Sequence, residues 1–129
     1  MIHVLLITHG SMAEGMVSSV RMLIGAQEDF DYVTFAEDMG QDELKELLDT
    51  KITGASAEKQ YLIMCDLKGG TPFNVASRYS FKNDHISVFY GVNLPILIET
   101  LIGREGKDLA EITPYLQEAG PATLGIGEI

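Results

Sequence analysis

Cysteine is nearly absent from the sequence: Cys65 is the single one among 129 residues. It cannot form a disulfide within the chain, and it follows Met64 in an apolar run, so we expect it to pack as a small core side chain. No apolar run approaches the length of a membrane span, and the N-terminus lacks the basic flank and cleavage site of a secretory signal. We therefore expect a cytoplasmic protein.

Positive charge is also scarce. Nine Lys and Arg stand against 19 Asp and Glu, which gives a formal net charge of −10. A nucleic acid needs a basic footprint on its partner, and anionic membranes need one too, so both are excluded as partners. The acidic surface favours a basic protein partner through long-range attraction, although solubility alone explains the acidity equally well.

The sequence has no metal-ligand spacing and no nucleotide-binding loop. Its three histidines and one cysteine are isolated from each other, so we expect no metal site. No Walker loop, G-x-S-x-G or G-x-G-x-x-G motif occurs, so a nucleotide-dependent kinase has no support and we expect no cofactor. His3 lies inside a predicted strand and His85 beside a polar turn, and we expect neither to be catalytic.

Short apolar segments alternate with helical patterns along one domain, residues 1–129, without repeats or linkers. This alternation predicts an α/β fold: a doubly wound, mainly parallel sheet with helices on both faces. In a flavodoxin-like order the first and third strands are neighbours. The apolar, glycine-containing tail at 122–126 predicts a short C-terminal strand. The other strands are expected at 2–8, 32–36, 61–66 and 86–90, and the helices at 12–24, 41–51, 72–79, 94–102 and 108–119.

The most informative residue is His9, which directly follows the first apolar run. Ser11 and Glu14 have the spacing of a capping box and predict a helix start there. His9 is therefore expected on the turn between the first strand and helix, at the carboxyl edge of the sheet. Ligands bind at that edge in open α/β sheets.

A second polar group follows the third predicted strand. Asp66 ends that strand, and the run LKGGTPFN follows it at 67–74. Thr71 is expected to cap the next helix and Pro72 to occupy its first position. Gly69 and Gly70 allow backbone amides to approach an anion closely, and the helix dipole favours negative charge at this place.

These residues together predict a phosphoryl group bound to an imidazole. If the first and third strands are neighbours, Asp66 can accept the Nδ1 proton of His9 and leave Nε2 free to attack phosphorus. Gly10, Gly70 and Thr71 are the expected phosphate-binding residues, because amides and a hydroxyl stabilise phosphoryl oxygens without a metal. Taken singly, His9 is also explained as a polar turn residue, Asp66 as the end of a strand, and the GGTP run as a loop.

Three motifs resemble the IIA component of mannose-family sugar phosphotransferase systems: THG at 8–10, Asp66 followed by GGTPFN at 69–74, and GVNLP at 91–95. The resemblance implies that His9 is phosphorylated at Nε2. The phosphocarrier HPr, charged by phosphoenolpyruvate through enzyme I, would be the donor and a histidine of a IIB component the acceptor. Asp66 matches the aspartate that orients the histidine, and Gly70 and Thr71 match positions that hold phosphoryl oxygens.

The resemblance also implies partners. Members of the family form homodimers through a C-terminal strand that crosses to the other subunit, which the tail at 122–126 would supply. We expect the IIB component and the membrane permease to be separate chains, the permease being a partner only indirectly. Lys68 and Asn93 lie near the same edge as His9 and are candidate partner-binding residues, or else surface bystanders.

Two other interpretations stay open. One is the related phosphotransfer subunit of a dihydroxyacetone kinase, which the complete GGTPFN run makes the weaker choice. The other is a non-enzymatic regulatory α/β module that binds a partner through its acidic surface. The transported sugar is not encoded in a domain that never touches it.

Overall fold

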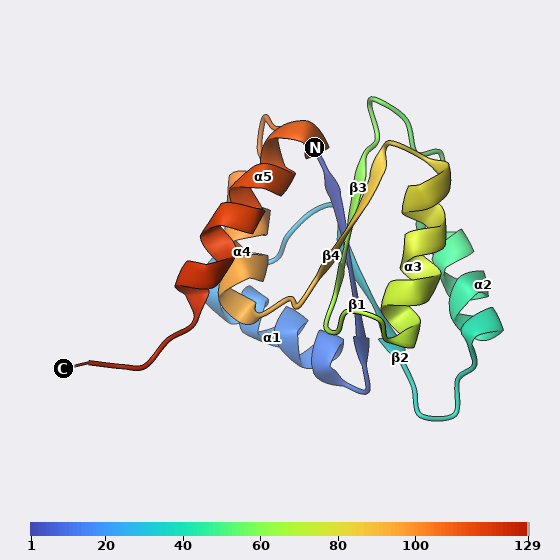
Figure 1. The fold of residues 1–129 in the computed structure, drawn as a ribbon, viewed down its shortest axis with the longest axis horizontal. Coiled ribbons are helices and arrows are strands. Elements are labelled where there is room, and N and C mark those ends of the chain that lie inside the picture. The colour runs from blue at the N-terminus through green and yellow to red at the C-terminus, as the bar shows by residue number, and fades with distance from the viewer. Residues whose placement is uncertain (129) are drawn as a thin grey trace.

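The computed structural model describes residues 1–128, in which strands and helices alternate as predicted (Figure 1). The elements in chain order are β1 (His3–His9), α1 (Met12–Ile24), β2 (Phe30–Phe35), α2 (Gln41–Lys51), β3 (Tyr61–Cys65), α3 (Thr71–Lys82), β4 (Ile86–Tyr90), α4 (Leu94–Gly103), α5 (Leu109–Ala119) and the 3-10 turn η1 (Gly120–Thr123). No helix in this part of the chain combines the length and apolarity needed to cross a bilayer.

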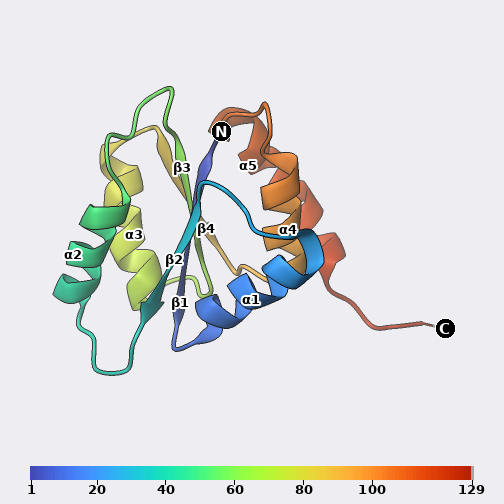
Figure 2. The same cartoon turned by 180° about the vertical axis from the view of Figure 1, so that it is seen from behind.

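The four strands form one parallel sheet in the order β2-β1-β3-β4. The predicted adjacency of the first and third strands is therefore confirmed. In the register, Ile7 of β1 lies opposite Cys65 of β3, and His9 lies opposite Phe35 of β2. All four carboxyl ends lie at one edge of the sheet, where the loops to the next helices begin (Figures 1 and 2).

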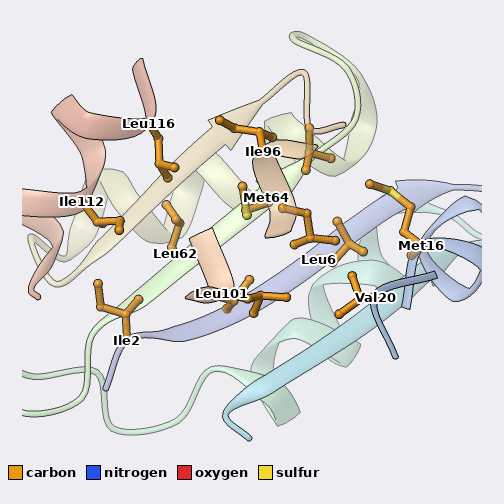
Figure 3. Close-up of a cluster of buried hydrophobic side chains, with 14 of the residues drawn as sticks. Ile2, Leu6, Met16, Val20, Leu62, Met64, Ile96, Leu101, Ile112 and Leu116 are labelled. Atoms are coloured by element: carbon orange, nitrogen blue, oxygen red, sulfur yellow. The ribbon is translucent and has the colours of Figure 1, made fainter. Parts of the chain in front are cut away.

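Helices cover both faces of the sheet, which explains why the strands are mostly apolar. Successive side chains of β1 alternate between the two faces: Val4 and Leu6 pack with α1, α4 and α5, whereas Leu5 and Ile7 pack with α2 and α3. Figure 3 shows the first of these cores. By the same alternation His9 emerges on the α2/α3 face, at the point where this packing ends.

The predicted C-terminal strand does not form within the described residues 1–128. Residues 120–123 form η1, and residues 124–128 have no regular structure and extend away from the body (Figures 1 and 2). A strand requires a neighbour to pair its backbone groups, and the tail has none among these residues. Leu124 and Ile126 are consequently 76% and 93% exposed.

Arg104 ties the amino-terminal edge of the sheet together. It follows α4, is almost completely buried, and donates to the backbone oxygens of Ile2, Glu28 and Asp29. Burial is the main reason that its pKa is lowered, with the nearby Asp29 carboxylate acting in the opposite direction. The end of α4 is thereby joined to the starts of β1 and β2, opposite the edge that carries His9.

Candidate functional site

The His9 imidazole lies at the carboxyl end of β1 and contacts Asp66 directly after β3. His9 is the last residue of β1, rather than part of the following turn as expected. Its Nδ1 lies 2.9 Å from Oδ2 of Asp66. Because a carboxylate can only accept, this contact places the proton on Nδ1 and the lone pair on Nε2. The sequence prediction that these two side chains meet is confirmed.

The Asp66 carboxylate is held by the backbone as well as by the ring. Oδ2 also accepts from the backbone N–H of His9 at 3.0 Å, and Oδ1 accepts from the N–H of Leu67 at 3.0 Å. The Asp66 side chain is only 10% exposed, whereas the imidazole is 42% exposed. The carboxylate is therefore fixed in orientation, and the ring it holds remains open to a partner from outside.

Within residues 1–128 no hydrogen bond reaches Nε2 of His9. The α-carbon of Gly70 lies beside this atom: a methyl group added there would be 3.0 Å from Cε1 and 3.5 Å from Nε2. Gly69 has φ +80°, a conformation that favours glycine, and it turns the loop so that Gly70 reaches the ring. Asn74 secures the loop by donating from its side chain to the Gly69 oxygen at 3.1 Å.

Helix α3 begins at this loop, with a different cap from the one predicted. Gly70 is the N-cap, Thr71 is the first helical residue, and no side chain caps the end. The first N–H groups of a helix have no acceptor within the helix. Since Pro72 has no N–H, the free donors of this first turn are the backbone amides of Thr71 and Phe73. An anion beside His9 would meet these donors and the positive end of the helix dipole.

Helix α1 begins three residues after His9, and its cap also differs from the prediction. Ser11 is the N-cap but its side chain makes no capping hydrogen bond. Instead Thr8, fully buried, accepts from the N–H of Ala13 at 2.7 Å. Gly10, with φ +60°, makes the turn between the strand and the helix. The sequence signal missed here is the threonine that immediately precedes His9.

The two predicted partner-contact residues have different environments. Lys68 is exposed, and its Nζ lies 5.3 Å from the centroid of the Tyr90 ring. Both polar atoms of the Asn93 side chain are hydrogen-bonded within the chain. Its Oδ1 accepts from the Ile96 N–H at 2.9 Å, and its Nδ2 donates to the Thr123 hydroxyl at 2.8 Å. Asn93 therefore caps α4 and joins it to η1, while Lys68 is free to meet another molecule.

Cys65 and Phe35 complete the surroundings of the site. Burial, and secondarily the Asp66 charge, raise the pKa of the Cys65 thiol to about 12, so the thiol stays protonated. Phe35 at the end of β2 contacts the His9 ring edge-to-face and was not predicted from the sequence. Residues 1–128 contain no group of three His, Cys, Asp or Glu side chains arranged to hold a metal ion.

Comparisons with known proteins agree on one family. The family model described as "PTS system fructose IIA component" matches residues 3–116, where PTS is the phosphotransferase system. The chain is 36% identical over 98 residues to the mannose-specific EIIAB component of Escherichia coli K12, covering 76% of this chain and 30% of that protein. It thus spans about a third of that relative's length. It is 30% identical to the fructose-specific EIIA component of Bacillus subtilis 168, covering 91% of this chain and 80% of the relative.

Solved structures show the same fold. The phosphotransferase component EIIA from Streptococcus agalactiae superposes with a TM-score of 0.90 at 26% identity, covering 98% of this chain and 97% of that one. The mannose/sorbose specific IIA subunit from Enterococcus faecalis gives a TM-score of 0.89 at 27% identity, covering 99% and 96%.

The contact between Gly70 and the imidazole makes a structural prediction. Gly70 has φ −75°, which alanine adopts without strain, so Gly70→Ala should fold while its methyl group displaces the ring by a few tenths of an ångström. Gly69→Ala is the matched control, since its left-handed backbone should cost about 1 kcal/mol although its added methyl group meets no atom.

Urea denaturation at fixed protein concentration and ¹⁵N spectra of the imidazole would separate the two variants. We expect Gly69→Ala to lower the free energy of unfolding without moving the His9 signals. We expect Gly70→Ala to move the His9 signals without lowering the free energy of unfolding. Unchanged imidazole signals in Gly70→Ala would contradict the close approach of this loop.

Proposed function

Because this chain belongs to the EIIA-man family of PTS IIA components, we propose that it is a phosphoryl carrier of a phosphoenolpyruvate-dependent sugar phosphotransferase system. In this role it accepts a phosphoryl group from HPr on His9 and passes it to a histidine of a IIB component. A carrier of this kind acts in the cytoplasm and reaches the membrane permease only through IIB. The observation that carries the proposal is the His9–Asp66 pair, with Nε2 open beside the uncapped start of α3.

The geometry supports a direct transfer. The lone pair of Nε2 attacks phosphorus in line while the bond from phosphorus to the donor nitrogen breaks, and the donor imidazole leaves. The Nδ1 proton stays on the His9 ring, which becomes positively charged, and the Asp66 carboxylate at 2.9 Å stabilises that charge. Because Asp66 takes no proton, the carrier returns to its starting state when IIB removes the phosphoryl group.

The phosphoryl oxygens need positive potential rather than a chemical group that reacts with them. Backbone amides at the starts of α1 and α3, together with the Thr71 hydroxyl, supply that potential beside Nε2. Gly70 contributes by letting the start of α3 come close to the ring, and Gly10, with φ +60°, by turning the chain from β1 into α1. Transfer on this route uses no cofactor.

Lys68 remains a candidate partner contact. It is the single Lys or Arg in the four loops that follow the carboxyl ends of the strands, at 10–11, 36–40, 66–70 and 91–93. An exposed ammonium here would meet a carboxylate of HPr or IIB. Asn93 supports the site from within the chain through its bonds to α4 and η1.

The chain also supports the homodimer implied by its family. Strand β4 pairs with β3 on one side only, and an open pocket of about 660 Å³ lies along its other side, lined by β4, α5 and η1. Leu124 and Ile126 lie two residues apart, so in an extended tail they point to the same face. The tail of one subunit pairing with β4 of the other would complete both sheets and bury these exposed side chains.

Phosphorylation of His9 is the test of the proposed function. With HPr, enzyme I and phosphoenolpyruvate, the protein should gain one phosphoryl group that is labile in acid and stable in base, the behaviour of a phosphohistidine. His9→Ala should abolish the gain, and the matched His85→Ala should keep it. Labelling that persists in His9→Ala, or transfer to a dihydroxyacetone kinase subunit instead of IIB, contradicts the proposal.

Asp66→Asn tests the role of the carboxylate. Both carboxylate oxygens accept from N–H donors, so an amide must turn its own NH₂ toward one of these donors. We expect phosphoryl transfer to slow by about 100-fold or more, since the amide cannot stabilise a cationic ring, and unfolding to become easier by about 1–3 kcal/mol. The control is Asp38→Asn, an exposed aspartate in the loop after β2. A wild-type transfer rate in Asp66→Asn would show the carboxylate to be dispensable.

The double variant Leu124→Ser with Ile126→Ser tests the dimer. We expect sedimentation to show a dimer for the wild type and a monomer for the variant, because the tail loses its apolar contacts. Phe81→Ser, which changes a side chain that is 92% exposed on α3, is the control and should stay dimeric. Equal masses for wild type and tail variant would rule out the tail as the dimer contact.

A further inference from the structure

Phe35 provides a third contact to the His9 imidazole, besides Asp66 and Gly70. The two ring centroids lie 5.7 Å apart and the ring planes are at 85°, an edge-to-face arrangement. We infer that Phe35 is a positioning residue that fixes the tilt of the imidazole and thereby the direction of Nε2. As a role in transfer, this inference rests on the proposed phosphorylation of His9.

The backbone holds the two residues in place relative to each other. His9 and Phe35 are register partners in neighbouring parallel strands, so their side chains emerge on the same face of the sheet. Just beyond this pair, the N–H of Gly10 donates to the Phe35 oxygen at 3.0 Å. The end of β2 therefore cannot move away from the end of β1 without breaking that bond.

Phe35 is also anchored from its other side. Its ring is partly buried and packs against the core under α2 and α3, the same core that contains Val33, Leu44 and Leu48. Close packing there leaves the Phe35 ring little freedom to rotate. An immobile ring on one side of the imidazole restricts the imidazole in turn.

This restriction is needed because a single hydrogen bond does not fix a ring. The contact from Nδ1 to Asp66 holds one atom of the imidazole, and the ring can still tilt through changes in χ1 and χ2 of His9. Gly70 approaches Cε1 from the loop after β3, and the Phe35 ring on β2 lies with its plane nearly perpendicular to that of the imidazole. In-line transfer depends steeply on the direction of the attacking lone pair, so the tilt affects the rate.

Three variants test the inference. Phe35→Leu keeps an apolar side chain but removes the ring, Phe35→Tyr restores the ring, and Phe30→Leu makes the same change at the other end of β2. We expect Phe35→Leu to lower kcat for phosphorylation by HPr about tenfold with KM unchanged, since about 1 Å of misplacement costs up to 100-fold. Phe35→Tyr and Phe30→Leu should stay within about twofold of wild type, because both keep an aromatic ring against His9.

A spectroscopic measurement on the unphosphorylated protein separates this inference from the proposed function. The ¹⁵N spectrum of His9 should show one ring environment protonated at Nδ1 in wild type and Phe35→Tyr, and a mixture or broadened signals in Phe35→Leu. If that pattern is found but the wild type accepts no phosphoryl group, the proposed function fails while the positioning role stands.

The inference is overturned if Phe35→Leu keeps the wild-type kcat and imidazole spectrum. It is equally overturned if Phe30→Leu lowers kcat as much as Phe35→Leu, or if Phe35→Tyr does not restore the rate. Should Phe35→Leu fail to fold, Phe35→Met carries the same expectations.

Discussion

The site depends on one carboxylate that accepts three hydrogen bonds. Asp66 receives the ring N–H and the backbone N–H of His9 on one oxygen and the N–H of Leu67 on the other. The first two bonds connect β1 to the end of β3, and the third holds the carboxylate in its own loop. The tautomer of the imidazole and its open Nε2 follow from this arrangement.

The strand order of the sheet brings His9 and Asp66 together. Strands that are buried on both faces carry mostly apolar side chains, so the polar groups of the site lie at the strand ends. The order β2-β1-β3-β4 places the His9 strand between Phe35 and Asp66, and the loops at this edge lead into α1 and α3. Arg104 joins the opposite edge, where β1 and β2 begin. The site is thus assembled from the ends of strands and the starts of helices.

Much of this arrangement could be predicted from the sequence. Apolar runs alternating with helical patterns indicated the parallel sheet, and a histidine and an aspartate at the ends of two such runs indicated their meeting. The details of the helix starts could not be predicted, because residue type alone does not tell which hydroxyl reaches the helix amides: Thr8 caps α1 instead of Ser11, and no side chain caps α3. At α1 the buried Thr8 hydroxyl accepts the hydrogen bond from the helix, because its side chain lies against the first turn.

Other features depend on packing that local patterns do not describe. Phe35 contacts His9 because the two residues are register partners in neighbouring strands. Asn93 donates a hydrogen bond to Thr123, which lies 30 residues further along the chain. Among residues 1–128 the tail at 122–126 pairs with no strand, so its apolar residues alone were not enough to form one.

The hydrogen bonds between His9 and Asp66 span 57 positions of the chain. During synthesis β1, α1 and β2 leave the ribosome together, before β3 and its carboxylate have been made. The emerging segment therefore already holds His9 and Phe35, but it lacks the group that selects the tautomer. Under the proposed function, a nascent or misfolded chain in which the second half of the sheet has not docked would lack the competence to drain phosphate from the donor.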